Sequence, residues 1–168
     1  MSQSIEYAEH DGALPPALIA RIGELLVACF GEPFPRFRQR LHGKPDLHLV
    51  LATDGERAVG FKLSYRRGQD ECYSWLGGVH PDYRRRGIAR ALMRQQHAWA
   101  HGAGYQSVTT EPENRYRSML ILDLQEGFEI VGTYFHDSGQ LRILLRKALA
   151  SGVNDVDLAT RESGPVLS

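Results

Sequence analysis

The sequence predicts an α/β fold in which helices flank one mixed, mostly antiparallel sheet. Two observations support this prediction: strand patterns joined by tight turns fill the first half, whereas strands and helices alternate in the second half. The chain has 168 residues, 42% of them hydrophobic, which is enough for the core of one domain. We place that domain at residues 1–150 and expect the polar remainder, residues 151–168, to be a disordered tail.

The first half contains one long helical pattern among four strand patterns. Pro15 and Pro16 favour the first turn of a helix, because the N–H groups there have no helical partner in any case. Gly31 ends this helix, and an irregular segment with a helical turn follows it up to residue 42. Asp54-Gly55 is a hairpin signal. The predicted strands cover residues 4–9, 47–53, 58–65 and 71–79, and the last of them holds a Gly-Gly pair typical of a bulge or a closely approaching backbone.

The second half alternates between the two periodicities. A helical pattern begins at Gly87 and stops at Gly102 and Gly104. A short strand is predicted at residues 107–110, and a second helix is predicted at residues 115–126, followed by Gly127. The last two predicted strands cover residues 128–135 and 141–145.

Composition excludes several classes of protein. Twenty Lys and Arg residues balance twenty Asp and Glu residues, so the chain lacks the basic excess typical of nucleic-acid-binding proteins. We therefore expect no nucleic-acid partner and disfavour an RNA-associated protein that would use the arginine run at residues 84–86. The N-terminal residues do not resemble a signal peptide, and no apolar stretch approaches the ~20 residues that span a bilayer. The sequence thus predicts a cytoplasmic protein with no membrane partner.

Cysteine and histidine spacing does not predict a metal site. Cys29 and Cys72 lie in apolar patterns, where reduced and buried thiols are the ordinary interpretation. His97 and His101 are one helical turn apart but have no third ligand nearby in the sequence, so we expect exposed helix residues. No metal is expected.

The segment from Val79 to Ala89 predicts an anion-binding turn. Pro81 stops the preceding strand, and a helix begins near Gly87. The free N–H groups of a first helical turn, together with the positive end of the helix dipole, bind phosphate oxygens. Small side chains at Gly87 and Ala89 would let a diphosphate approach, and the arginines would add charge.

This segment resembles the acetyl-CoA motif of the GNAT superfamily of N-acetyltransferases, Arg/Gln-x-x-Gly-x-Gly/Ala, which Arg84, Gly87 and Ala89 match. Residues 76–83 are similar to the strand that precedes the motif in that family. Asn114 and the later Gly-Phe pair at residues 127–128 resemble its second conserved block. The resemblance extends over residues 5–145 and is densest between residues 75 and 135.

The resemblance implies acetyl-CoA as the co-substrate. It implies that Val79 bonds the pantetheine arm through its backbone, as an added strand would, and that residues 84–89 hold the diphosphate. Asn114 would lie beside the pantetheine or the thioester. The resulting candidate CoA-binding residues are Val79, His80, Arg84, Arg85, Arg86, Gly87, Ile88, Ala89, Asn114 and Met119. Enzymes of this kind form no acyl-enzyme, so the amine attacks the thioester directly in a ternary complex.

The acid and the base are less clearly indicated. The family often carries a tyrosine four residues before the Gly-Phe pair, as the acid for the CoA sulfur, but Asp123 occupies that position here. A helical wheel places Asp123 among apolar neighbours. Either the end of this helix is exposed and Asp123 contacts water, or Asp123 polarises or hydrogen-bonds the thioester. Tyr116 and Tyr134 are alternative acids, although each also fits a core aromatic residue. The candidate bases are Glu71, Tyr73 acting through a water molecule, and Glu32.

The acceptor class is open at this point. The candidate acceptor-binding residues are Glu32, Phe34, Tyr73 and Trp75, and the acceptor is a small-molecule amine or an amine of a peptide or protein. A homodimer is also considered. The alternative function is that of a non-catalytic CoA-binding sensor or partner-binding module on the same fold.

Overall fold

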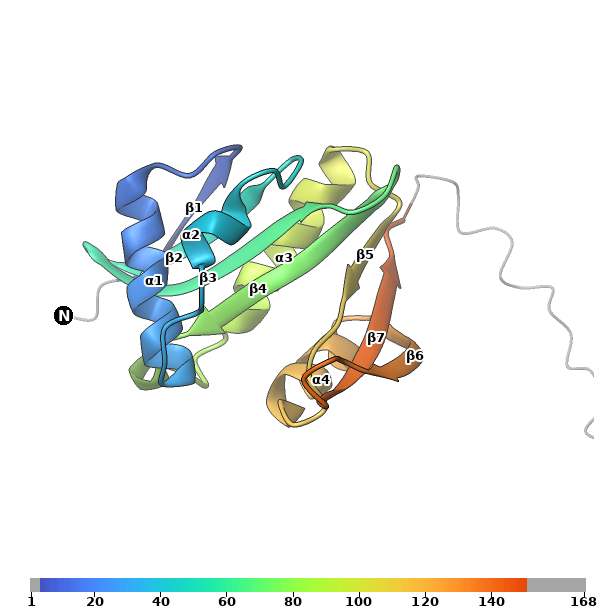
Figure 1. Cartoon of the computed structure of the whole chain (residues 1–168). Coiled ribbons are helices and arrows are strands. Elements are labelled where there is room, and N and C mark those ends of the chain that lie inside the picture. Colours follow the sequence, from blue (N-terminus) through green and yellow to red (C-terminus); the bar gives the residue numbers. More distant parts are fainter. Residues whose placement is uncertain (1–3, 151–168) are drawn as a thin grey trace, which may run out of the picture.

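A single seven-stranded sheet organises the chain in the computed structural model, which describes residues 4–150 (Figure 1). Its strands are Glu6–Asp11 (β1), His48–Asp54 (β2), Arg57–Arg66 (β3), Glu71–Val79 (β4), Ser107–Thr110 (β5), Glu129–Phe135 (β6) and Leu141–Ala148 (β7). They lie in the order β1-β2-β3-β4-β5-β7-β6. Within the described residues every neighbouring pair is antiparallel except β4 and β5, so the predicted mixed sheet is confirmed.

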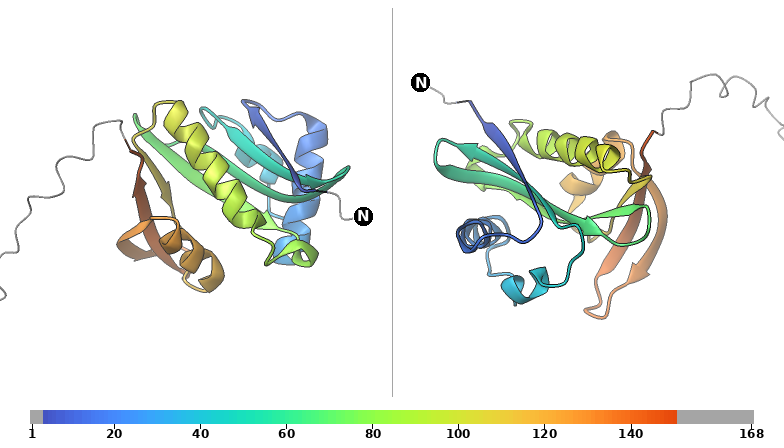
Figure 2. Two further views of the ribbon diagram at one scale, coloured as in Figure 1. Left: turned by 180° about the vertical axis from the view of Figure 1, so that it is seen from behind. Right: turned by 90° about the horizontal axis from the view of Figure 1, so that it is seen from above.

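Helices cover both faces of this sheet (Figure 2). On one face lie α1 (Pro16–Phe30) and α2 (Phe37–Leu41), and on the other lies α3 (Ile88–Gly102), which follows a short 3-10 helix at Pro81–Tyr83. The connection from β5 to β6 contains α4 (Arg117–Gln125). Arg90 donates to Gln125 at 2.7 Å and Arg94 pairs with Glu126 at 2.8 Å, so α4 is held beside α3. No helix of residues 4–150 is long and apolar enough to cross a membrane.

Apolar side chains fill the space between helices and sheet on both faces. Under α1 and α2 the core includes Ile22, Leu26, Leu49, Phe61 and Leu63, each at most 1% exposed. Beneath α3 the buried side chains form two clusters, which include Val50, Val59, Ile88 and Leu92 in one and Cys72, Met93, Val108 and Leu145 in the other. Successive residues of β3 face the helices on opposite sides of the sheet, and helices cover both sides. This strand is therefore buried along most of its length.

The predicted helices and strands agree with the structure within a few residues at their ends, and the hairpin at Asp54-Gly55 joins β2 to β3 as predicted. Some side-chain expectations are wrong. His97 is buried rather than exposed, because α3 turns it toward the sheet. Tyr116 and Tyr134 are 38% and 37% exposed instead of lying in the core. Cys72 is buried, but Cys29 is only half-buried. The predicted tail at residues 151–168 lies outside the described residues.

The parallel pair β4 and β5 separates soon after it forms. Only Glu71 to Tyr73 of β4 pair with β5, and the Thr110 hydroxyl donates to the Ser74 carbonyl at 3.0 Å where the pairing ends. Beyond this point no strand of residues 4–150 pairs with Trp75–Val79 on its β5 side, and Figure 1 shows the two strands diverging. A bulge in β4 opposite Leu63 lies at the point of divergence. We call this opening between the two strands the β4–β5 gap.

The Gly-Gly pair of β4 marks a close approach, as predicted. A Cβ atom at Gly78 would lie 2.8 Å from the Cys29 sulfur and 3.3 Å from its Cβ, so only glycine lets α1 pack this closely on β4. Gly77 faces the other layer, where the Lys62 side chain passes over it.

We predict that Gly78→Ala lowers the free energy of unfolding by about 1–3 kcal/mol, because the added methyl forces α1 away from β4. Urea unfolding measures this value. Replacing Cys29 with Ala in the same chain should recover part of the loss, since the sulfur is the closest atom. Gly102→Ala is the control, because a Cβ there meets nothing within 4 Å. Equal stability of Gly78→Ala and the parent would contradict this packing.

Candidate active site

The turn between β4 and α3 presents a set of free backbone N–H groups. The backbone N–H groups of residues 85–90 donate to no acceptor within residues 4–150. Gly87 precedes α3 with φ +78°, a left-handed conformation that suits glycine, and no side chain in the described part of the chain caps the helix. A Cβ at Gly87 would meet nothing within 4 Å, so the space in front of these groups is open. The arrangement fits a diphosphate.

The three arginines before Gly87 differ in what they contact. Arg84 Nε donates to the Val79 carbonyl at 3.1 Å and its NH2 group donates to the Cys29 carbonyl at 3.3 Å, so this side chain ties the turn to β4 and α1. Arg86 lies over the ring of Tyr83. Arg85 is exposed and has φ +61°. Arg84 therefore helps to shape the turn, and its expected contact with a phosphate stays a prediction.

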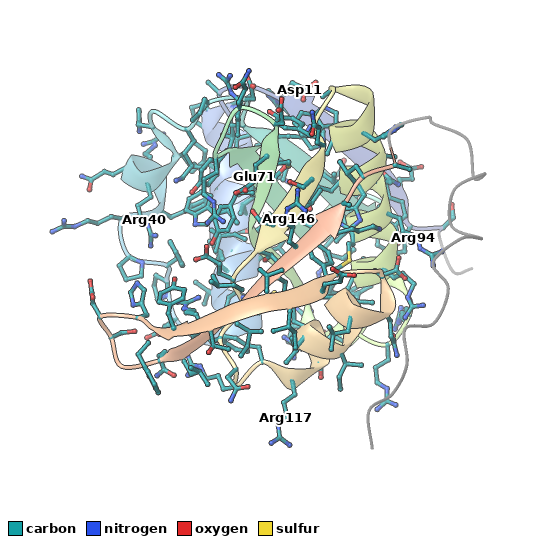
Figure 3. All side chains as sticks on the ribbon, turned by 90° about the vertical axis from the view of Figure 1, so that its right-hand side faces the viewer. Asp11, Arg40, Glu71, Arg94, Arg117 and Arg146 are labelled. Carbon is teal, nitrogen blue, oxygen red and sulfur yellow. The ribbon has the colours of Figure 1, made fainter. Side chains whose placement is uncertain are left out.

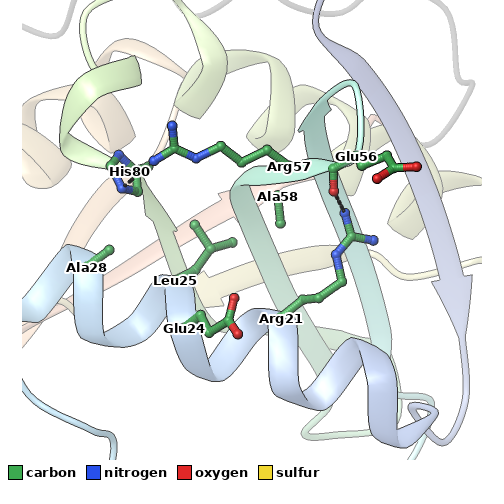
Figure 4. A pocket seen from close by; sticks show the side chains of 8 residues that line it. All are labelled: Arg21, Glu24, Leu25, Ala28, Glu56, Arg57, Ala58 and His80. Carbon is green, nitrogen blue, oxygen red and sulfur yellow. Dashed lines mark hydrogen bonds between the residues drawn. The ribbon is translucent and has the colours of Figure 1, made fainter.

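The His80 side chain contacts Asp82 and Arg57. Its Nδ1 accepts from the Asp82 N–H at 3.2 Å, and its Nε2 lies 3.1 Å from the guanidinium of Arg57. The side chains of His80 and Arg57, together with Arg21 and Glu24 of α1, line a pocket of about 340 Å³ between α1 and the β2–β3 hairpin (Figure 4). Ile88 is buried in the core below the turn, and Ala89 is partly buried beside it. The side chains of both residues therefore lie behind the turn, whereas their own backbone N–H groups belong to the free set.

The α4 side of the gap carries the remaining predicted CoA residues. Asn114 is exposed, and its N–H donates to the Leu141 carbonyl at 2.9 Å. Met119 packs against the buried cluster under α3. The Tyr116 ring meets the Phe30 ring edge-on at 6.0 Å, so the start of α4 contacts the end of α1.

Asp123 is 2% exposed, which agrees with its place among apolar neighbours on the helical wheel. Burial raises the pKa of this carboxyl to about 6, although the charge of Lys62 lowers it. Lys62 is itself 8% exposed, and burial lowers its pKa while Asp123 raises it. Sequence reasoning did not find Lys62, because a lysine in a strand is usually solvated.

A second charged cluster, around Arg67, lies beside the paired residues of β4 and β5 and extends to Glu111, which follows β5. This guanidinium lies over the Tyr73 ring, donates to Glu71 at 2.8 Å and forms an ion pair with Glu111. The Tyr134 hydroxyl donates to the other oxygen of Glu111 at 2.9 Å. The structure therefore brings three predicted residues, Glu71, Tyr73 and Tyr134, together around Glu111. Sequence reasoning missed Arg67 and Glu111, since both lie in segments without a motif.

Glu71 is already engaged in this cluster. Burial raises its pKa, but hydrogen bonds from Arg67 and Thr109 and the charge of Arg67 outweigh that effect and lower it below its usual range. Figure 3 shows Glu71 on the same end of the molecule as Arg146, whose charge acts in the same direction. Glu71 also pairs with Ser107 at the end of the β4–β5 ladder that is farther from the gap, so it suits a supporting role.

Aromatic rings line the surface next to this cluster, on the α2 side. Phe34 meets Trp75 edge-on at 6.2 Å, and Trp75 meets Tyr65 at 5.9 Å. Two cations, Arg40 and Lys44, stack on these rings. Glu32 is exposed on the loop before them and is not part of the Glu111 cluster.

We predict that Asp123→Asn changes the pH dependence of stability. The folded protein holds the Asp123 proton up to a pH of about 6, whereas the unfolded chain loses it near pH 4, so ionising this group destabilises the fold as pH rises between these values. Asn carries no such charge. The variant should therefore gain stability relative to the parent, on the order of 2 kcal/mol, between pH 4 and pH 7. Denaturant unfolding at each pH measures it, and parallel curves would contradict the assignment.

The chain is similar in sequence and in fold to known acetyltransferases. An acetyltransferase of Sodalis glossinidius is 40% identical over 68 residues, which is 40% of this chain and 46% of that protein, so the chain matches about half the length of this curated relative. Among solved structures, the ribosomal-protein-S18-alanine N-acetyltransferase from Escherichia coli superimposes with a TM-score of 0.72 at 15% identity, covering 89% of this chain and 99% of that one. The NatC complex bound to Gag peptide and CoA gives 0.71 at 19% identity, covering 86% and 99%.

At these identities the solved structures show the shared fold alone. The family model described as "Acetyltransferase (GNAT) family" matches residues 19–118, which include β2 to β5, the turn at Gly87 and the start of α4. This match covers more than half of the chain. The chain belongs to the GNAT acetyltransferase family.

Proposed function

We propose that the protein transfers an acetyl group from acetyl-CoA to a primary amine by direct attack in a ternary complex. One observation carries the proposal: the free N–H groups of residues 85–90 lie next to the unpaired edge of β4 at Trp75–Val79. A diphosphate and an amide-containing arm are the two parts of CoA that these features fit. Family membership and the CoA named for the NatC complex support the same substrate.

In this proposal CoA follows the β4–β5 gap. The diphosphate accepts hydrogen bonds from the mouth of α3, where Gly87 leaves space. The pantetheine amides pair with the free edge of β4 as an additional strand. The thioester then lies in the gap, with Gly77 on one side and α4 on the other, and the amine reaches it from the Glu111 cluster.

We assign the base to Glu111, supported by Tyr134. Glu111 lies just after β5, where the β4–β5 gap begins, and it accepts hydrogen bonds from Tyr134 and Arg67. An ionised carboxylate in this place can accept the proton that the attacking ammonium loses, directly or through water. Tyr73, Trp75 and Phe34 form the wall that the acceptor would contact. The acceptor is an amine of a small molecule, a peptide or a protein.

The homodimer considered from the sequence stays a prediction. Its candidate surface is the edge strand β6, where Ile130, Val131 and Phe135 are 55%, 59% and 75% exposed. An exposed apolar edge strand is the kind of surface that a second chain can cover.

We predict that Gly87→Glu weakens CoA binding by at least about 100-fold, because a side chain with negative charge would occupy the space in front of the N–H groups. Isothermal titration calorimetry with CoA measures the change. Gly139→Glu is the matched control, since Gly139 also has a φ of +79° and nothing within 4 Å of its Cβ position, but lies in the β6–β7 turn. Unchanged affinity of Gly87→Glu would exclude the mouth of α3 as the diphosphate site.

We predict that Glu111→Gln lowers kcat by about 100-fold or more with an active amine, because the amide cannot accept the proton. Release of the CoA thiol from acetyl-CoA, measured with a panel of amines, first identifies an acceptor. Glu129→Gln changes an exposed glutamate of β6 and should keep the parental rate. A Glu111→Gln rate equal to the parent's would assign the base elsewhere. CoA binding without thiol release for every amine would favour the non-catalytic module.

A further inference from the structure

Lys62 and Asp123 are two buried, opposite charges that do not meet. Lys62 is 8% exposed and Asp123 is 2% exposed. In residues 4–150 neither side chain forms a hydrogen bond, and neither takes part in an ion pair within 4 Å. Each charge nevertheless acts on the other, because Asp123 raises the pKa of Lys62 and Lys62 lowers the pKa of Asp123. A buried charge without a direct partner is costly, so this pair requires an explanation.

The position of Lys62 relative to the strands supplies that explanation. Lys62 pairs with Gly77 across β3 and β4, and its Nζ lies 3.7 Å from the place that a Gly77 Cβ would occupy. The lysine therefore crosses β4 where glycine leaves room, toward the edge that β5 has already left. Asp123 comes from α4, which follows β5 on the other side of the gap. Lys62 reaches the β4–β5 gap across Gly77, and the effect of its charge on Asp123 places the α4 carboxyl close to it.

We propose that Lys62 is the acid of the reaction and that it donates a proton from Nζ to the departing CoA sulfur while Asp123 keeps it charged. This proposal rests on acetyl transfer as the function of the gap. As the amine nitrogen bonds to the acetyl carbon, the carbon–sulfur bond breaks and its electron pair stays on sulfur. Sulfur takes the Lys62 proton, Glu111 takes the proton of the amine, and exchange with solvent restores both groups. The products are the amide and the CoA thiol.

The surroundings of Lys62 suit an acid. Burial lowers the pKa of its ammonium, so it gives up a proton more readily than a solvated lysine does. The groups that face it are Asp123 from α4, Cys72 from β4 and His97 from α3, with Lys147 of β7 at 3.1 Å behind His97. Burial, together with the charges of Lys147 and Lys62, lowers the pKa of His97 to about 3, so this ring stays neutral. Asp123 is therefore the only one of these groups that supplies a negative charge at neutral pH.

A titration of bound CoA tests the proposal without any acceptor. The thiolate of CoA absorbs ultraviolet light, so its absorbance reports the pH at which the bound thiol ionises. An ammonium beside the sulfur should lower that pH by about one unit or more relative to free CoA. Lys62→Met should abolish the shift. Lys147→Met, which removes another partly buried lysine under α3, should retain it. A bound thiol that ionises like free CoA in the parent protein would overturn the proposal, even if Lys62→Met failed to fold.

Kinetics provide the second arm. Lys62→Met should lower kcat about 100-fold while its Kd for CoA stays within a few-fold of the parent's. The parental kcat should fall at alkaline pH as Lys62 loses its proton, and Lys62→Arg should move this fall to higher pH. A Lys62→Met enzyme with the parental kcat would overturn the assignment of Lys62 as the acid, while acetyl transfer itself would still stand. Failure of the parent to acetylate any amine would instead refute the proposed function, while the thiol titration would still report on Lys62.

Discussion

The separation of β4 from β5 is the constraint on which the site depends. After three parallel pairs β4 loses its neighbour, and the edge at Trp75–Val79 must find other partners for its backbone groups. An extended arm with its own amides is such a partner. The mouth of α3 opens at one end of this edge, the Glu111 cluster lies at the other, and Lys62 crosses it at Gly77. One interruption in the sheet therefore sets the place of each part of the site.

Within residues 4–150, the start of α3 lacks a stabilising side-chain cap. A Ser, Thr, Asp or Asn cap before the helix would satisfy one of its N–H groups and contribute about 1 kcal/mol. The chain has Gly87 instead, and Arg84 directs its charge to the carbonyls of Val79 and Cys29. The turn is thus held in shape by contacts behind it, and the N–H groups in front are left for a ligand. An uncapped helix with a firmly held turn is typical of a binding site.

Local patterns in the sequence predicted most of the fold and the anion-binding half of the site. The hairpin at Asp54-Gly55 and the turn at Gly87 are determined by neighbouring residues, and so both could be predicted. The pairs Lys62–Asp123 and Arg67–Glu111 join residues 61 and 44 positions apart, and only the finished sheet brings them together. His97 was placed wrongly because its polarity suggested solvent, although it follows the buried Met93 by one turn of α3.

A crystal structure of the protein with CoA tests the central claim most directly. We expect the diphosphate oxygens within hydrogen-bonding distance of the N–H groups of residues 85–90. We expect the pantetheine amides to pair with Trp75–Val79 and the sulfur to lie between Lys62 and Asp123. CoA bound in the pocket beside Arg57 and His80, with nothing between β4 and β5, would contradict the account.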